Sequence, residues 1–289
     1  MRVSTFALVA SVTVGLVGCK DTKREAAQRS LTHMTEAVRD ARAGVDQLTR
    51  SFVPVLDGLA PSLTRSMTAQ DIPGIRYALI GMNTQHTAAG SLSFFPTGFI
   101  AAVGPDGVAL ARNVDESGDL MRGMPLASLF PSIRGALGGT SGLSVGELPA
   151  SGDSPSRVYL VASVPVRDAA NVVIGALAAG ISYGQLARSV DTAVRMHTGQ
   201  TPVVWVGLLR NGRVLPSGHD RDVPERWLVP ASLISQIPAN SATRLATPNA
   251  EFSWTFVEGG ERGWAGALGV LPQLEGTNVL IFRSEAQQN

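Results

Sequence analysis

Lysine is almost absent from this chain of 289 residues, in which Lys20 and Lys23 are the only two. A Walker A loop needs a lysine on the nucleotide phosphates, and Schiff-base chemistry needs a buried one. Neither site can be built from the residues after Lys23. Charged residues make up only 16% of the chain, and the formal net charge is +1. Because phosphate neutralisation needs a strongly basic surface, the composition argues against nucleic-acid binding.

Histidines are also few, and no catalytic motif is evident. The four histidines lie far apart, without the spacing of zinc or facial-triad ligands. The segment Gly139-Thr-Ser-Gly142 lacks the Gly-x-Ser-x-Gly elbow of the hydrolases. The carboxylates form no pattern that is typical of glycosidases. We therefore expect a protein that is not an enzyme and that carries no metal and no cofactor, with an envelope enzyme of unrecognised type as the remote alternative.

The single cysteine, Cys19, ends an apolar segment in which Arg2 is the only charge. A charged start, an apolar middle and a small-residue exit are typical of a secretory signal. Leu16-Val-Gly-Cys19 resembles the lipobox of bacterial lipoproteins, which implies removal of the signal peptide 1–18 and acylation of Cys19. The resemblance predicts a lipid anchor in a membrane of the cell envelope, on the periplasmic side. Lys20, a residue other than aspartate after the cysteine, favours the outer membrane.

A long apolar stripe follows the signal segment. From Ala27 to Leu59 the apolar residues step by four and three, which is the spacing of a and d positions in a heptad repeat. The stripe fits either the seam of a parallel coiled-coil homodimer or a helix that lies along its own domain. Pro54 and Pro61 are expected to kink or end the helix. We assign residues 19–90 to an N-terminal amphipathic helical segment.

Turn signals and apolar runs then describe a first lobe. Asp106-Gly107 lies between two apolar runs and predicts a hairpin. A helix is expected over 125–137, and strands are expected over 158–165 and 172–177. A further helix over 183–197 would lead to the next region. A hairpin, a helix and further strands are typical of a small antiparallel sheet with helices on one face.

The same pattern recurs in a second lobe. Asn211-Gly212 follows the apolar run 203–209 and repeats the hairpin signal of the first lobe. A short helix is expected over 231–237, and strands are expected over 252–257 and 279–282. We therefore assign two lobes after the helical segment, at 91–200 and 201–289.

Three stretches of the first lobe, at 104–112, 131–139 and 162–177, carry a family resemblance. They read GPDGVALAR, PSIRGALGG and ASVPVRDAANVVIGAL. These stretches resemble Cache domains, the PAS-like extracytoplasmic sensor modules of bacterial chemoreceptors and histidine kinases. The resemblance implies an α+β fold, in which a long N-terminal helix precedes two PAS-like lobes, each an antiparallel sheet with flanking helices. Cache receptors usually continue into a membrane helix and a signalling domain, whereas this sequence ends at Asn289.

Ligands of PAS-like sheets lie between the sheet and the helices that cover it. The polar residues expected near such a pocket are Arg112, Arg122, Arg134, Arg157, Tyr159 and Tyr183. Guanidinium groups bind carboxylates in bidentate fashion, so a small anionic metabolite would suit them. Cache receptors for amino acids typically show an Arg-x-Trp-Tyr element, and Arg122-Gly-Met-Pro125 lacks the aromatic pair.

We expect the glycine-rich first lobe to hold the ligand, because all four tryptophans lie in the second lobe, where they are expected to fill its core. The leading hypothesis is a lipid-anchored sensor that binds a small molecule and acts through an envelope signalling partner, without a transmitter domain of its own. The alternative is a structural or assembly lipoprotein of the envelope, in which side chains fill the PAS-like core.

Overall fold

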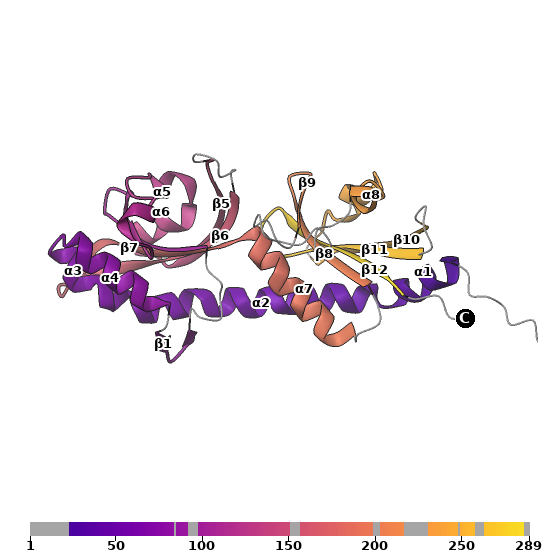
Figure 1. Ribbon diagram of the computed structural model, residues 1–289, viewed down its shortest axis with the longest axis horizontal. Helices are drawn as coiled ribbons and strands as arrows, with labels where there is room; N and C mark the ends of the chain where they lie inside the picture. Colours follow the sequence, from indigo (N-terminus) through magenta and orange to yellow (C-terminus); the bar gives the residue numbers. More distant parts are fainter. Residues whose placement is uncertain are drawn as a thin grey trace, which may run out of the picture.

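The computed structural model describes residues 23–83, 85–91, 98–150, 157–198, 203–216, 231–247, 249–257 and 263–285. Two lobes, each built on a five-stranded sheet, lie side by side along a pair of N-terminal helices (Figure 1). All strand pairs in the two sheets are antiparallel. The predicted α+β class, with a long N-terminal helix and two PAS-like lobes, is confirmed. Cys19 and the signal segment 1–18 lie outside the described residues.

The N-terminal helices α1 (Lys23–Thr32) and α2 (Met34–Leu59), here called the spine, carry the predicted apolar stripe. Its residues are at most 1% exposed at six positions along α2: Met34, Val38, Ala41, Val45, Phe52 and Val55. These side chains belong to one core that continues into both sheets. The stripe therefore lies along the chain's own lobes, and the predicted alternative of a homodimer seam is wrong because that seam is already covered.

The helix α2 continues through Pro54, where the sequence predicted a kink or an end. Pro54 faces solvent, so water can bond the carbonyl that the proline leaves without a partner. The helix ends instead at Leu59, one residue before a short 3-10 turn, η1 (Ala60–Leu63), with Pro61 in its first turn. Two helices follow, α3 (Thr64–Thr68) and α4 (Ile72–Met82).

The first sheet has the strand order β4-β3-β7-β6-β5. Its strands are β3 (Phe99–Val103), β4 (Ala109–Arg112), β5 (Gly142–Leu148), β6 (Arg157–Arg167) and β7 (Val173–Ser182). A separate small hairpin pairs β1 (His86–Thr87) with β2 (Gly90–Ser91). Successive side chains of a strand point to opposite faces, so Ile100 and Leu160 join the core over the spine, while Phe99 and Tyr159 face the other side.

Two short helices, α5 (Leu126–Leu129) and α6 (Pro131–Leu137), cover that other face (Figure 1). The sequence predicted one helix over 125–137, and this expectation was wrong at Phe130. Phe130 adopts an extended backbone with φ −128° and ψ 106°. The residue before a proline is disfavoured in the α region, so Pro131 ends the first helix and begins the second.

The helix α7 (Tyr183–Thr198) leads into the second lobe, as predicted. The second sheet has the order β10-β11-β12-β8-β9. Its strands are β8 (Val203–Arg210), β9 (Arg213–Pro216), β10 (Glu251–Val257), β11 (Gly263–Val270) and β12 (Thr277–Ser284). One face packs on the spine through residues such as Ala267 and Ile281.

The opposite face of the second sheet carries α8 (Ala231–Ile234) and α9 (Ser241–Arg244). The helix α8 is shorter than the predicted span 231–237. Pro238 lacks an N–H, and in a helix its ring would clash with the carbonyl of Ile234, so the helix cannot extend. In the described part of the chain, no helix is both long and apolar enough to cross a membrane.

Candidate functional site

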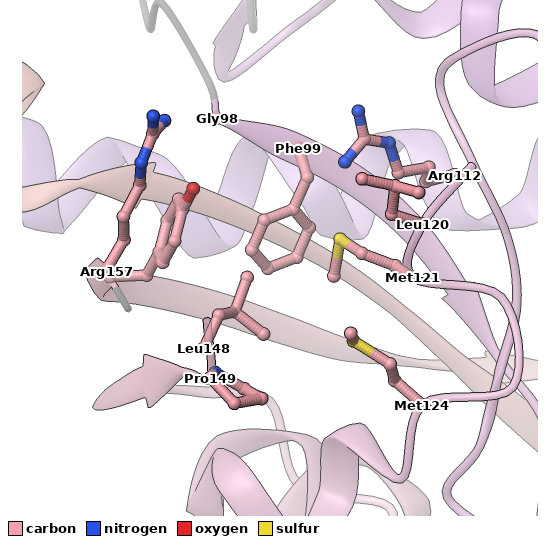
Figure 2. Close-up of a pocket in the computed structure, with 10 residues that line it drawn as sticks. Gly98, Phe99, Arg112, Leu120, Met121, Met124, Leu148, Pro149 and Arg157 are labelled. Carbon is pink, nitrogen blue, oxygen red and sulfur yellow. The ribbon is translucent and has the colours of Figure 1, made fainter. Parts of the chain in front are cut away.

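A pocket of about 250 Å³ opens on the outer face of the first sheet (Figure 2). Its apolar floor and walls come from the strands, from the residue after β5 and from the loop between β4 and α5: Phe99, Leu120, Met121, Met124, Leu148 and Pro149. Its polar groups are Arg112, Arg157 and Tyr159. The structure thus brings three of the six predicted site residues together around one cavity.

The floor of the pocket is an aromatic pair. Phe99 is 1% exposed, and its ring meets that of Tyr159 edge-on at a centroid distance of 5.4 Å. Gly180 lies directly opposite Phe99 on the neighbouring strand β7. A Cβ atom at Gly180 would lie 2.2 Å from Cε1 of Phe99, so the ring can keep its observed position only beside a glycine. The position of the floor therefore depends on this glycine.

Arg112 is the polar residue whose environment most favours a ligand. It ends β4, and its backbone N–H donates to Oδ2 of Asp119 at 3.1 Å. Its guanidinium lines the pocket, where it makes no hydrogen bond or ion pair with any residue in the described ranges. The Nε atom is buried without a partner. A partly buried cation without a partner is costly, and an anion bound in the pocket would compensate that cost.

Arg157 and Tyr159 lie on β6, on the side of the pocket away from Arg112. Figure 2 shows the guanidinium groups of Arg157 and Arg112 on opposite sides of the Phe99 ring, with Met121 and Leu148 beneath. The arrangement offers two cationic groups at the rim and an apolar surface between them. It suits a small molecule with a negatively charged group and an apolar body.

A covering loop, residues 113–124, forms one wall of the pocket. It is held by the buried carboxylate of Asp119, whose Oδ1 accepts the backbone N–H of Met121 at 3.3 Å. On the other side of this carboxylate, Nη2 of Arg76 on α4 lies 3.6 Å from Oδ2. Our sequence analysis did not find Leu120, Met121 and Met124 as lining residues. The available signal was a group of apolar residues within an otherwise polar, glycine-rich loop.

The other three predicted residues lie outside this lining. Nη1 of Arg122 pairs with Oε1 of Glu116 at 2.7 Å on the surface. Arg134 is on α6, and its Nη2 donates to the carbonyl of Ala127 at 3.3 Å. Neither guanidinium reaches the pocket, because each is held by a neighbour near it in the sequence.

Tyr183 is a contact between the lobes. It is 1% exposed, and its hydroxyl lies 2.9 Å from Oγ1 of Thr277 on β12. Burial raises the pKa of Tyr183, while the hydrogen bond with Thr277 and the charge of Arg210 act in the opposite direction. The hydroxyl is therefore neutral at ordinary pH and joins the first lobe to the second.

Aromatic rings occupy the corresponding face of the second sheet. The ring of Trp254 meets that of Phe282 edge-on at 6.1 Å, and Phe256 stacks on Trp264 at 6.5 Å. These contacts agree with the prediction that tryptophans fill this lobe, although Trp227 lies outside the described residues. Among the residues that the structure describes, no cluster of three His, Cys, Asp or Glu side chains forms a metal site.

The fold is shared with solved bacterial sensor domains. The sensor domain of the histidine kinase DctB from V. cholerae matches with a TM-score of 0.55 and 11% identity, over 90% of this chain and 98% of that one. The periplasmic domain of V. cholerae LuxQ matches with a TM-score of 0.52 and 13% identity, over 87% and 100%. The sensory domain of the Campylobacter jejuni chemoreceptor Tlp3 with isoleucine bound matches with a TM-score of 0.51 and 13% identity, over 91% and 96%.

These matches show that the chain shares the two-lobed fold of these sensor domains. The predicted resemblance to double Cache sensor domains is thereby confirmed for the architecture. No protein-family model matches the sequence, and no curated protein sequence is significantly similar to it. At these low identities, the similarity concerns the arrangement of helices and strands.

Proposed function

We propose that this protein is an extracytoplasmic sensor that binds a small anionic metabolite in the pocket of the first lobe. The observation that carries the proposal is the guanidinium of Arg112, which lines the pocket without a partner among the described residues. An unpaired guanidinium beside an apolar floor is the arrangement expected where a carboxylate binds and completes the hydrogen bonds.

The pocket also limits the size and character of the ligand. A volume of about 250 Å³ fits a small metabolite. Phe99, Met121 and Leu148 offer apolar contacts for its carbon skeleton. Arg157 lies on the opposite side from Arg112 and already makes an interaction of its own. A small monocarboxylate with an apolar body meets these requirements best.

The structural relatives support a sensor role. The C. jejuni chemoreceptor Tlp3 was solved with isoleucine bound, and DctB is a histidine kinase with a sensor domain of this fold. For this chain, an open pocket in the first lobe favours ligand binding over the alternative of an envelope lipoprotein with a filled core. A signalling partner in the envelope would then receive the conformational change.

Lipid anchoring through Cys19 is part of the proposal and rests on the sequence Leu16-Val-Gly-Cys19. Acylation with two or more chains anchors a protein stably. Mass spectrometry of the mature protein is expected to show an acylated N-terminal Cys19 and no residue from 1–18. Cys19→Ser is expected to move the protein from the membrane fraction to the soluble fraction. An unmodified Cys19 in the wild-type protein would contradict the anchor, and fractionation of inner and outer membranes tests the predicted outer-membrane location.

The ligand pocket is tested by a thermal-shift screen of mono- and dicarboxylates, followed by calorimetry on each compound that raises the melting temperature. Arg112→Ala is expected to weaken binding about tenfold or more, because a charge-assisted hydrogen bond is worth about 1.5–3 kcal/mol. Arg134→Ala is the matched control, since it removes a guanidinium of the same lobe that lies outside the pocket. Equal affinity of the Arg112→Ala variant and the wild type would contradict the site.

A further inference from the structure

The two sheets end in four edge strands, β4 and β5 in the first sheet and β9 and β10 in the second. An edge strand presents backbone N–H and C=O groups that can pair with another chain, and proteins usually protect such edges. Protection comes from short length, proline, lysine, a bulge, or a covering loop or helix. Differences in protection therefore indicate which edge is available to a partner.

Two of the four edges are protected. The edge of β4 bonds to the covering loop, because Ala109 N donates to Met124 O and Gly123 N donates to Ala109 O, each at 2.9 Å. The strand β9 spans only Arg213–Pro216 and ends in a proline. The helices α1 and α9 contact β10 (Glu251–Val257) from the two faces of its sheet, so its outer edge is not covered by them. Within the described residues, the edges of β4 and β9 therefore offer no long row of free backbone groups.

Within the described residues, no loop or helix is bonded to the outer edge of β5, and the strand is not short. It runs for seven residues, Gly142–Leu148, with the sequence GLSVGEL, and contains neither lysine nor proline. Among the described strands it pairs with β6 alone, over the whole of its length and without a break in register. The helices α5 and α6 pack on its face and leave its outer edge toward the second lobe (Figure 1). A strand of this composition is suited to pairing with a further strand.

A groove runs along this edge. One cavity of about 370 Å³ is lined by Leu143 and Val145 of β5 and, on the second lobe, by Gln273 and Arg210. A second cavity of about 140 Å³ continues past Gly146 and is also lined by Arg210. At its end, Nη1 of Arg213 lies 3.9 Å from Oε1 of Glu147, an ion pair between the lobes. Both cavities lie between β5 and the second lobe and share Arg210 as a lining residue, and together they are called the interlobe groove here.

The lining of the interlobe groove indicates the chemistry of its occupant. Leu143, Val145 and Leu160 supply apolar surface. On the opposite wall, Nη1 of Arg210 donates to the carbonyl of Glu275 and lies 3.2 Å from Oγ1 of Thr277. Arg210 makes no ion pair with a carboxylate in the described ranges. Arg210 is thus hydrogen-bonded to neutral groups and lines the groove beside Glu275, and no ion pair among the described residues neutralises its charge.

We propose that the interlobe groove binds an extended segment of a partner protein, which adds as a further strand to the edge of β5. Backbone hydrogen bonds to β5 provide the affinity, and alternate side chains provide the specificity. The segment carries apolar residues that face Leu143 and Val145, and an Asp or Glu that pairs with Arg210.

The probe is a random heptapeptide library, displayed on phage and selected on the whole protein. Enriched peptides are expected to alternate apolar residues with polar ones and to carry an Asp or Glu. With such a peptide bound to the wild-type protein, hydrogen exchange is expected to slow at the amides of residues 143–147 and to remain unchanged in β4. This measurement requires no substitution and therefore does not depend on the folding of a variant.

The contact between Arg210 and the acidic residue of the peptide is tested by combining an Arg210 variant with a peptide analogue. Arg210→Ala is expected to weaken the acidic peptide about tenfold and to leave the analogue with an amide in place of the carboxylate almost unchanged. Arg122→Ala, which removes an exposed guanidinium elsewhere, is the matched control. The pocket of the first lobe is separate from the interlobe groove. The Arg112→Ala variant is therefore also expected to bind the peptide with wild-type affinity.

Four results would overturn the proposal. The first is a selection that enriches no binding peptide, and the second is protection of amides outside β5. The third is competition by free amino acids, which would indicate a small-molecule site. The fourth is self-association that protects β5 without any peptide, which would make a second copy the occupant.

Discussion

The two lobes share one packing arrangement, an aromatic ring opposite a glycine, but differ in what surrounds the ring. In each sheet an aromatic residue lies directly opposite a glycine on the neighbouring strand, Phe99 opposite Gly180 and Trp254 opposite Gly266. In the first lobe the ring borders a pocket. In the second lobe the ring packs edge-on against Phe282. The aromatic–glycine pair is therefore common to both sheets. The residues around the pair determine whether the ring borders a pocket or packs against other rings.

The largest expected effect comes from removing a ring in the filled lobe. Phe282 is fully buried and meets the rings of Trp254 and Phe256 edge-on at 6.1 and 5.8 Å. Phe282→Ala is expected to lower the free energy of unfolding by about 3–5 kcal/mol. Phe99→Ala is expected to cost less, because it extends a pocket that already exists. Urea denaturation of both variants measures the difference, and equal losses would show that the lobes are packed equally well.

Overpacking the two glycines gives a smaller effect and sharpens the same contrast. A Cβ atom at Gly266 would lie 2.5 Å from Cζ2 of Trp254, and one at Gly180 would lie 2.2 Å from Cε1 of Phe99. Gly266→Ala is expected to cost about 1–3 kcal/mol, because its ring has packed neighbours to displace. Gly180→Ala is expected to cost less, because the Phe99 ring can move into the pocket.

The substitutions of Gly180 and Gly266 are also expected to differ in their effect on ligand affinity. A Phe99 ring that moves into the pocket reduces its volume, so Gly180→Ala is expected to weaken any ligand found for the first lobe. Gly266→Ala is expected to leave that affinity unchanged and serves as the control. A Gly180→Ala variant that is as unstable as Gly266→Ala and binds normally would contradict the idea that the pocket accommodates the ring.

The smallest expected effect concerns Asp191 on α7, the helix between the lobes. Its side chain is 16% exposed, and burial raises its pKa above the usual 3.8, opposed by Arg195 at 2.8 Å. The folded state therefore holds this proton more tightly than the unfolded chain does. Stability is expected to fall as the pH rises from 3.8 through the raised pKa, and to level off above it. Asp191→Asn is expected to flatten this slope in urea denaturation across that pH range, and an unchanged slope would assign it to other groups.

Turn chemistry explains why so much of the fold could be predicted from the sequence. Gly107 adopts a φ of 81°, and Asn211 and Gly212 adopt 49° and 73°, which are conformations that asparagine and glycine favour. Both hairpins could therefore be predicted from the sequence, one from Asp106-Gly107 and the other from Asn211-Gly212. The apolar stripe of the spine was visible as well, but its periodicity does not say whether the covering surface comes from the same chain or from another.

The candidate site was only partly visible, because it depends on which side chains converge in space. Arg112 and Arg157 lie on different strands, and only the sheet brings both to one cavity. Arg122 lies close to the covering loop's lining residues in sequence but turns to Glu116 instead. Nothing in the composition separates a guanidinium held by a neighbour from one left facing a pocket.

The spine has a consequence for the order in which the protein is made. Its stripe is synthesised before the strands that cover it, and part of that cover comes from the second sheet, far along the sequence. Val38 packs against Gly269, and the backbone N–H of Glu285 donates to Oγ of Ser30 at 3.1 Å across a separation of 255 residues. Contacts this distant along the chain form late in folding. A chain interrupted before β12 would leave uncovered the part of the stripe that faces the second sheet, so the nascent protein depends on protection from aggregation until that sheet is complete.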